Sequence, residues 1–335
     1  FSQLINCLDK KSPLDNIKGL AYFDKKNNIL IDNGPAETIQ DLDSLPFPAR
    51  ELTPYKRYSA LIMRSPVTSL FTSRGCPFRC KFCDRPALGK IFRARSAENV
   101  FQEIKECLKL GIKDFLIYDD TFTVDQQRVI DICKKIIDAK LDIQFNIRAR
   151  VNTVNPELLH YLKKAGCLTI HYGVESGSEK ILKSINKGIT LKQVKQAFAW
   201  TRKEKIQALA YFMIGHPQET EEDIKKTLKF IRSIDADYVM ISIYTPFPRT
   251  ESYDLGIGQG VFPDVWLELA KNPQMNFQMP IWGECFSKEE LQNFMTKGYK
   301  AFYLRPKNIL RQIAAIRNLH DFMKRFRAGL KIITK

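Results

Sequence analysis

Apolar residues between positions 66 and 245 fall into two alternating patterns. Short apolar runs, typical of buried strands, alternate with longer stretches whose apolar residues are spaced three and four apart, as on one face of a helix. Strands that alternate with helices form a parallel sheet with right-handed crossovers. The sequence therefore predicts an α/β fold, and spacing alone leaves open a doubly wound sheet or a (βα) barrel, complete or incomplete. The six predicted strands lie at residues 67–72, 114–119, 143–148, 168–173, 208–214 and 238–243.

Residues that start and stop helices support this pattern. Ser96 precedes the helical stretch after the first strand, and Gly111 follows it, as an N-cap residue and a helix-ending glycine do. Thr220 and Asp223 stand three residues apart at the start of a later helix, which is the pattern of a capping box. Cys107 falls on an apolar position of the first helix, where we expect a small buried side chain.

The flanking segments divide the chain into four predicted regions. The first begins with Phe1 rather than Met, so we expect it to be the tail of an upstream domain, and it contains a small hairpin. The second holds three prolines and is predicted to be a linker. After residue 245 the pattern is loop-like, helices are predicted from about residue 263, and the last helix is expected to start near Pro306. These regions are an upstream tail (1–41), a linker (42–65), the α/β domain (66–255) and a helical, basic C-terminal region (256–335).

Positive charge is concentrated at the C-terminal end. The net charge is +16, and residues 301–335 hold nine Lys and Arg side chains against one acid, Asp321. A basic end favours an anionic partner, nucleic acid or anionic lipid, and a solvated helix face is an equal alternative. No run approaches the roughly 20 apolar residues that cross a bilayer.

Three of the eight cysteines lie within eight positions, in the stretch TSRGCPFRCKFCDRP. Cys76, Cys80 and Cys83 have the spacing C-x3-C-x2-C and directly follow the first strand, at the sheet edge where ligands bind. Structural zinc takes four ligands, and zinc here would need Asp84 as an unusual fourth. A cubane iron–sulfur cluster takes one thiolate per iron, so three thiolates leave one iron open. We therefore expect iron–sulfur rather than zinc, in a reducing cytoplasm where the other cysteines stay free.

With Phe82 before the last cysteine and a (βα) series behind them, these residues resemble the radical S-adenosylmethionine (SAM) superfamily. The resemblance implies an incomplete (βα)6 TIM-like barrel with a helical C-terminal extension. It also implies a [4Fe–4S] cluster on Cys76, Cys80 and Cys83, whose open iron chelates SAM. An external donor supplies an electron, SAM is cleaved to methionine and a 5′-deoxyadenosyl radical, and the radical takes a hydrogen atom from the substrate.

The resemblance also assigns cofactor-binding positions. Glu175 and Ser176, after the fourth strand, would face SAM, or else cap the next helix. The backbone of Ile214 and Gly215, at the end of the fifth strand, would lie against the adenine. Arg150 ends the third strand, where it would pair with a carboxylate or form a salt bridge at the barrel rim.

Three residues are candidates for catalysis. The family pattern around the fifth strand is broken at His216, which would face the substrate or be structural. Asp119 and Asp120 end the second strand, where they would bind a ligand hydroxyl or accept a proton. One of the two would instead cap the helix that starts near Thr123, and we expect one functional and one structural residue.

The linker and the ending AFYLRPKNILRQI (301–313) resemble radical SAM enzymes that carry an N-terminal cobalamin-binding domain. That subgroup includes methyltransferases acting on unactivated carbon and a ring-forming enzyme of bacteriochlorophyll synthesis. The D-x-H-x-x-G signature that binds cobalt does not occur in these 335 residues, so cobalamin is inferred from context. The resemblance favours cobalamin-dependent C-methylation, or a related modification of the carbon skeleton, of a small, lipid-like or tetrapyrrole-like substrate.

Two other functions compete with this one. An RNA-modifying methylthiotransferase would use the positive charge, but its terminal RNA-binding β-barrel has no counterpart in the helical pattern after residue 305. A zinc-dependent nucleic-acid-binding module would leave the strand-end motifs unused. We therefore do not expect a nucleic-acid partner. The amphipathic pattern of residues 306–335 favours peripheral contact with the inner face of the membrane by a cytoplasmic protein, unless its apolar stripe packs on the barrel.

Overall fold

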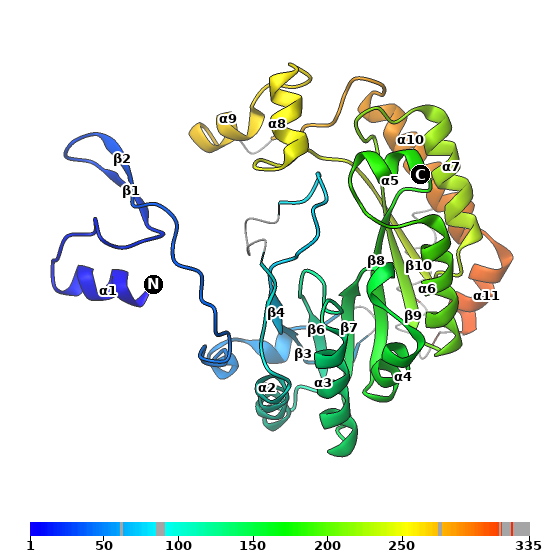
Figure 1. Cartoon of the computed structure of the whole chain (residues 1–335), viewed down its shortest axis with the longest axis horizontal. Coiled ribbons are helices and arrows are strands. Elements are labelled where there is room, and N and C mark those ends of the chain that lie inside the picture. Colours follow the sequence, from blue (N-terminus) through cyan, green and yellow to red (C-terminus); the bar gives the residue numbers. More distant parts are fainter. Residues whose placement is uncertain (61–62, 85–90, 274–276, 315, 317–322, 324–335) are drawn as a thin grey trace. The chain divides into compact units, whose positions relative to one another are not determined.

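The computed structural model describes residues 1–60, 63–84, 91–273, 277–314, 316 and 323, and it forms two compact units (Figure 1). The first unit spans Phe1–Leu45 and the second spans Pro46–Lys335. The first unit holds helix α1 (Ser2–Asp9) and an antiparallel hairpin of β1 (Ala21–Asp24) and β2 (Ile29–Asp32). The hairpin was predicted, whereas the helix was not.

The second unit is built on a six-stranded parallel sheet. Its strand order is β10-β9-β8-β7-β6-β3, so every strand lies beside its neighbour in the chain. A doubly wound sheet reverses its strand order at a switch point, and this sheet does not. The fold is therefore the predicted incomplete barrel, left open between its first and last strands. The strands are β3 (Val67–Leu70), β6 (Asp114–Ile117), β7 (Gln144–Ala149), β8 (Cys167–Glu175), β9 (Gln207–Ile214) and β10 (Tyr238–Ile243).

Helices follow the first five strands, as predicted. Ser96 accepts a hydrogen bond from the Asn99 backbone, and Thr220 and Asp223 form the expected capping box. Asp125 caps the helix after β6, so the expectation that Asp119 or Asp120 caps it is wrong. The short α5 was not predicted. The helices are α2 (Ala97–Lys109), α3 (Gln126–Asp138), α4 (Pro156–Lys164), α5 (Glu179–Ser184), α6 (Leu191–Lys203) and α7 (Glu221–Ser233).

Burial alternates along the strands and separates two faces of the sheet. On β9, Ala208, Ala210 and Phe212 are buried in the core shared with the helices, and the residues between them are only half-buried. Because side chains alternate across a strand, those intervening residues point to the inner face of the barrel. Cys107 of α2 is buried in the same core, as predicted.

The free edge of β10 is covered by two tyrosines of α10 (Lys288–Tyr303). The Tyr299 hydroxyl accepts from the Ile241 N–H at 3.0 Å and donates to its carbonyl at 2.9 Å. Tyr303 does the same for Val239, at 3.0 and 2.9 Å. An unpaired strand edge invites further pairing, so these hydroxyls end the sheet at six strands.

Replacing Tyr303 with phenylalanine is expected to lower the free energy of unfolding by about 1–3 kcal/mol, because two backbone groups of β10 lose their partner. Urea unfolding of the variant measures this. Tyr238→Phe is the control, since Tyr238 lies on the same strand and its ring remains. Equal stability of wild type and Tyr303→Phe would show that the edge does not need the hydroxyl.

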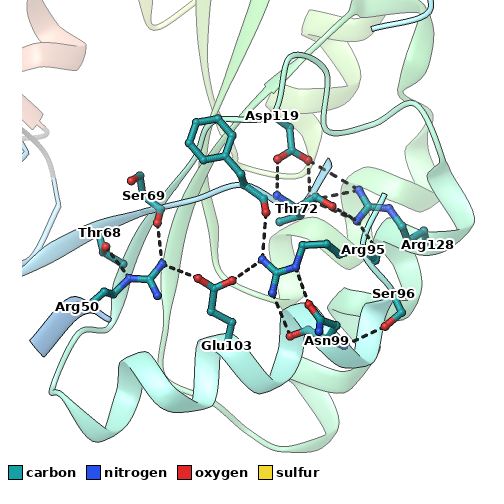
Figure 2. Close-up of polar contacts among 11 residues, drawn as sticks. Arg50, Thr68, Ser69, Thr72, Arg95, Ser96, Asn99, Glu103, Asp119 and Arg128 are labelled. Carbon is teal, nitrogen blue, oxygen red and sulfur yellow. Dashed lines mark hydrogen bonds and ion pairs between the residues drawn. The ribbon is translucent and has the colours of Figure 1, made fainter. Parts of the chain in front are cut away.

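The described part of the predicted linker from Pro46 onward belongs to the second unit. Arg50 is buried and donates to Thr68 at 3.0 Å and to Glu103 at 2.6 Å (Figure 2). Arg95 forms a second ion pair with Glu103, so one buried carboxylate pairs with two guanidinium groups. This network ties the linker to α2 and to the end of β3, which a proline-rich composition does not reveal.

The C-terminal region is helical, as predicted. It holds α8 (Glu251–Gly258), α9 (Val265–Lys271), α10 and α11 (Pro306–Ala314). The loop-like prediction after residue 245 is wrong for α8, which Thr250 caps and which packs Gly256 against Phe262 and Trp282. The last helix does start at Pro306.

The predicted membrane segment lies mostly outside the described residues, at 315, 317–322 and 324–335. Within the described part, Ile313 and Met323 are exposed. None of the helices described is both long and apolar enough to pass through a bilayer.

Candidate functional site

The cysteine loop starts from a short hairpin at the carboxyl end of β3. The strands β4 (Ser73–Arg74) and β5 (Arg93–Ala94) pair antiparallel and close the base of the loop. Gly75 follows β4 with φ +84°, a left-handed conformation that favours glycine. The chain therefore turns sharply into the first cysteine, Cys76.

Asp119 holds the base of this loop in place (Figure 2). Its carboxylate accepts hydrogen bonds from the Thr72 N–H, the Thr72 hydroxyl and the Ser73 hydroxyl, each at 2.6 Å, and Arg128 lies 3.9 Å away. Asp119 is fully buried, and burial raises the pKa of its carboxyl against these hydrogen bonds. With its oxygens occupied, Asp119 positions the loop and is not free to take a proton from a substrate.

Asp120 differs from its neighbour because it is exposed. Desolvation, followed by the charge of Asp119, raises its pKa, and a hydrogen bond from the Gly75 backbone opposes this. Its negative charge also helps to raise the pKa of the Cys83 thiol. Of the two predicted acids, Asp120 is the one that faces the cysteine loop, and its catalytic role stays a prediction.

The three predicted cysteines lie around the same loop. Cys80 is buried, and its Sγ accepts a hydrogen bond from Arg150 at 3.4 Å. Cys76 Sγ lies 3.8 Å from the Thr121 hydroxyl. Cys83 keeps exposed surface, but desolvation of its thiol and the nearby Cys80 and Cys76 raise its pKa to about 11. The Cys83 sulfur therefore lies within electrostatic range of the other two.

This donor set fits an iron–sulfur cubane. In the described part of the chain, no three His, Cys, Asp or Glu side chains converge as ligands of one metal ion would. A cubane asks for a different arrangement, because each thiolate binds its own iron at a separate corner. The three thiols from one turn match that demand, and the Arg150 guanidinium contacts one of them, Cys80.

Arg150 is buried beside the cluster loop rather than in a rim salt bridge. Its guanidinium donates to Cys80 and to the Lys187 carbonyl, and it lies 3.9 Å above the Phe78 ring. No ion pair joins Arg150 to an acid among the described residues, so the salt-bridge alternative is wrong. Its pairing with a ligand carboxylate stays a prediction.

Glu175 and Ser176 point to different surroundings. Glu175 has φ +72° and accepts a hydrogen bond from Lys187 at 2.6 Å, in a buried ion pair. The Lys187 ammonium also lies 5.7 Å from the Phe82 ring, so Glu175 is next to the cysteine loop. The Ser176 hydroxyl instead contacts Thr227 of α7 at 3.1 Å. The structure brings Glu175 to the site and turns Ser176 toward a helix.

The turn after β9 is shaped by a buried carboxylate. Glu219 accepts hydrogen bonds from the N–H groups of Gly215 at 2.6 Å and His216 at 3.0 Å. Gly215 has φ +86°, and a Cβ there would lie 2.8 Å from Leu291. Ile214 before it is fully buried. The backbone of the predicted adenine-binding segment is therefore held from behind by Glu219.

His216 is buried between aromatic rings. Its ring stacks on Tyr244 with centroids 5.1 Å apart and lies 6.5 Å from Phe82. Neither ring nitrogen has a hydrogen-bond partner among the described residues, and burial lowers the pKa of His216 to about 3. A neutral imidazole beside Phe82 is compatible with the predicted ligand-facing role, which stays a prediction.

Burial raises the pKa of Glu219 to about 7, which predicts a pH-dependent stability. At low pH the Glu219 carboxyl is protonated in both the folded and the unfolded state, and its contribution to stability is fully present. As pH rises toward about 7, the carboxyl ionises in the unfolded state before it ionises in the folded state, so the fold loses this stability. The loss is roughly 3 kcal/mol. Urea unfolding between pH 4.5 and 8 should show a steeper decline for wild type than for Glu219→Gln. Parallel curves would contradict this, and Glu222→Gln, an exposed acid of α7, is the control.

Comparison with known proteins identifies the class to which this fold and site belong. Residues 70–231 match the model of the radical SAM superfamily. A protein of Pyrococcus horikoshii named an uncharacterized methyltransferase is 36% identical over 317 residues, covering 93% of this chain and 67% of that protein. The chain therefore belongs to the radical SAM superfamily. Its cofactors accordingly include a [4Fe–4S] cluster and SAM.

A second relative and a solved structure extend this comparison. The anaerobic magnesium-protoporphyrin IX monomethyl ester cyclase of Cereibacter sphaeroides is 28% identical over 297 residues, covering 86% of this chain and 47% of the cyclase. The cobalamin-dependent SAM radical enzyme OxsB, solved with aqua-cobalamin and SAM bound, shares the fold with a TM-score of 0.68 and 21% identity, covering 98% of this chain and 53% of OxsB. The chain thus spans about half the length of these two proteins.

Several residues of the site were not found from the sequence. No sequence motif marks Lys187, which forms an ion pair with Glu175. The same holds for Thr72, which donates hydrogen bonds to Asp119. Glu219 belongs to a recognised segment, but its hydrogen bonds to the backbone of the turn were not foreseen. A fully buried acid next to a glycine turn is a signal that only the fold reveals.

Proposed function

We propose that this protein is a radical SAM methyltransferase that modifies an unactivated carbon. The observation that carries the proposal is the C-x3-C-x2-C loop at the carboxyl end of β3, with a buried guanidinium on Cys80. When bound, the reduced cluster supplies the electron that cleaves SAM to methionine and a 5′-deoxyadenosyl radical, which takes a hydrogen atom from the substrate.

The residues around the loop would hold these cofactors. Cys76, Cys80 and Cys83 would ligate the cluster, and Arg150 would stabilise the Cys80 thiolate through its hydrogen bond. Glu175, held by Lys187, would accept a hydrogen bond from the SAM ammonium. The turn at Gly215, fixed by Glu219, would present its backbone to the adenine.

Cobalamin and the methyl-transfer outcome are supported by the relatives. The Pyrococcus relative is named a methyltransferase, and OxsB is a cobalamin-dependent enzyme that shares the fold over 98% of this chain. Cobalamin would pass a methyl group from one SAM to the substrate radical. The likeness to the cyclase supports a tetrapyrrole-like substrate, and a lipid-like substrate is the alternative.

The test is anaerobic loading with iron and sulfide, followed by addition of SAM and dithionite. Formation of 5′-deoxyadenosine is the expected result, and methyl-labelled SAM should transfer its label to added cobalamin. Cobalamin found by mass spectrometry in protein purified from cells would support the subgroup. Loaded protein that forms no 5′-deoxyadenosine would overturn the proposal, and methylthiolated RNA nucleosides would point to the RNA-modifying alternative.

A further inference from the structure

The inner face of the barrel carries a cationic and polar set that the cofactor site does not use. Arg148 on β7 pairs in register with His171 on β8, and Gly173 on β8 pairs with Tyr211 on β9. Residues on either side of Arg148 in the strand are buried against the helices, whereas Arg148 itself is exposed. The side chains of Arg148, His171 and Tyr211 therefore point to the inner face of the barrel.

Arg148 has no acidic partner in the part of the chain that the structure describes. Its guanidinium lies 4.6 Å from the centre of the Tyr118 ring, and no ion pair is formed there. Its positive charge lowers the pKa of the Asp120 carboxyl, although the two side chains form no described ion pair. The buried Arg50 and Arg95, by contrast, share Glu103. An exposed guanidinium without an acidic partner among the described residues is suited to bind a carboxylate or phosphate through two hydrogen bonds.

A second donor stands beside it. The Tyr211 hydroxyl lies 3.0 Å from His171 Nδ1, and the two rings meet edge to face with centroids 5.8 Å apart. Burial and the charge of Arg148 lower the pKa of His171 to about 4, so this histidine is neutral at physiological pH. With a proton on Nδ1, His171 donates to the tyrosine oxygen and leaves the tyrosine proton free for a ligand.

This set lies beside the Glu175–Lys187 ion pair, which adjoins the cysteine loop. A Cβ on Gly173 would lie 2.5 Å from Glu175 Oε1 and 2.8 Å from Lys187 Nζ, so the absence of a side chain leaves room for that ion pair. Tyr211 is the register partner of Gly173 and therefore adjoins the pair. The Tyr118 ring lies beside the Arg148 guanidinium, and the half-exposed Phe71 ring lies 6.4 Å from the Tyr118 ring.

We propose that Arg148 and Tyr211 bind an oxyanion of the substrate, a carboxylate or a phosphate, and so hold its apolar body against Phe71 and Tyr118 near the radical site. This inference gives the substrate class of the proposed enzyme, and it rests on the proposed function. The anion site itself is a property of the folded barrel, so its binding is measured without turnover.

The test is thermal unfolding of the anaerobic, cluster-loaded protein in inorganic phosphate, sodium butyrate or sodium chloride at matched ionic strength. Wild type should gain stability with phosphate or butyrate beyond that in chloride, because a ligand of the folded state raises Tm. Arg148→Gln should weaken the apparent affinity at least tenfold. Arg148→Lys should weaken it less, because the charge remains while the two-pronged geometry is lost.

Matched variants make the result decisive. Arg232→Gln removes the same charge from an exposed position of α7 and should respond like wild type. Tyr211→Phe should weaken binding while leaving net charge unchanged, which keeps the test valid if Arg148→Gln does not fold. A larger response to phosphate indicates a phosphorylated substrate, and a larger response to butyrate indicates a carboxylate. Equal responses of wild type, Arg148→Gln and Tyr211→Phe to both anions would overturn the inference, whatever the outcome of the 5′-deoxyadenosine assay.

Discussion

Cys80→Ala is expected to abolish formation of 5′-deoxyadenosine and to leave the protein without a stable [4Fe–4S] cluster. Cys80 is the buried member of the three cysteines and the one that accepts the Arg150 hydrogen bond. Its loss removes one of three anchors and leaves a buried guanidinium without its sulfur partner. Iron content, the visible absorption of the cluster and product analysis by mass spectrometry measure the result.

Cys285→Ala is the matched control, because Cys285 is exposed and lies outside the loop. It should load iron and cleave SAM as wild type does. If Cys80→Ala kept a full complement of iron and sulfide together with wild-type SAM cleavage, the ligand assignment would be wrong. An equal loss in both variants would show that the effect is not specific to the loop.

Glu103→Gln is expected to lower the free energy of unfolding by about 3–5 kcal/mol, the range observed when one partner of a buried ion pair is removed. Glu103 is 1% exposed and forms ion pairs with both Arg50 and Arg95, so both guanidinium groups lose their acidic partner (Figure 2). Arg95 also donates to the Phe71 carbonyl beside the cysteine loop, so cluster loading should become less efficient.

Chemical denaturation followed by circular dichroism measures this change. Glu106→Gln on the same helix is the control, because Glu106 is exposed and pairs with Lys109 at the surface. Surface pairs contribute up to about 1 kcal/mol, so the control should remain close to wild type. Similar stabilities of the two variants would contradict a central role for the buried network.

Local patterns predicted the fold to a large extent. The alternation of strands and helices, the N-cap at Ser96 and the capping box at Thr220 depend on residues near in sequence, and the structure confirms them. The cysteine spacing marked the cluster loop for the same reason. Helix α8 was missed because its stability comes from packing of Gly256 under Phe262 and Trp282, not from periodicity.

The contacts that shape the site are distant in sequence and leave no local pattern. Asp119 meets Thr72 across 47 positions, and Arg50 meets Glu103 across 53. The sequence could show that two acids end β6, but only the fold shows that Asp119 has its oxygens occupied while Asp120 is exposed. The position of Arg148 on the inner face of the barrel likewise becomes visible only when its register with His171 is known.

The most direct test of the central claim is electron paramagnetic resonance of the dithionite-reduced, iron-loaded protein with and without SAM. A cubane held by Cys76, Cys80 and Cys83 has one iron open, so we predict a [4Fe–4S]⁺ signal whose g-values shift when SAM binds. A cluster signal that SAM leaves unchanged would contradict an open iron as the SAM site.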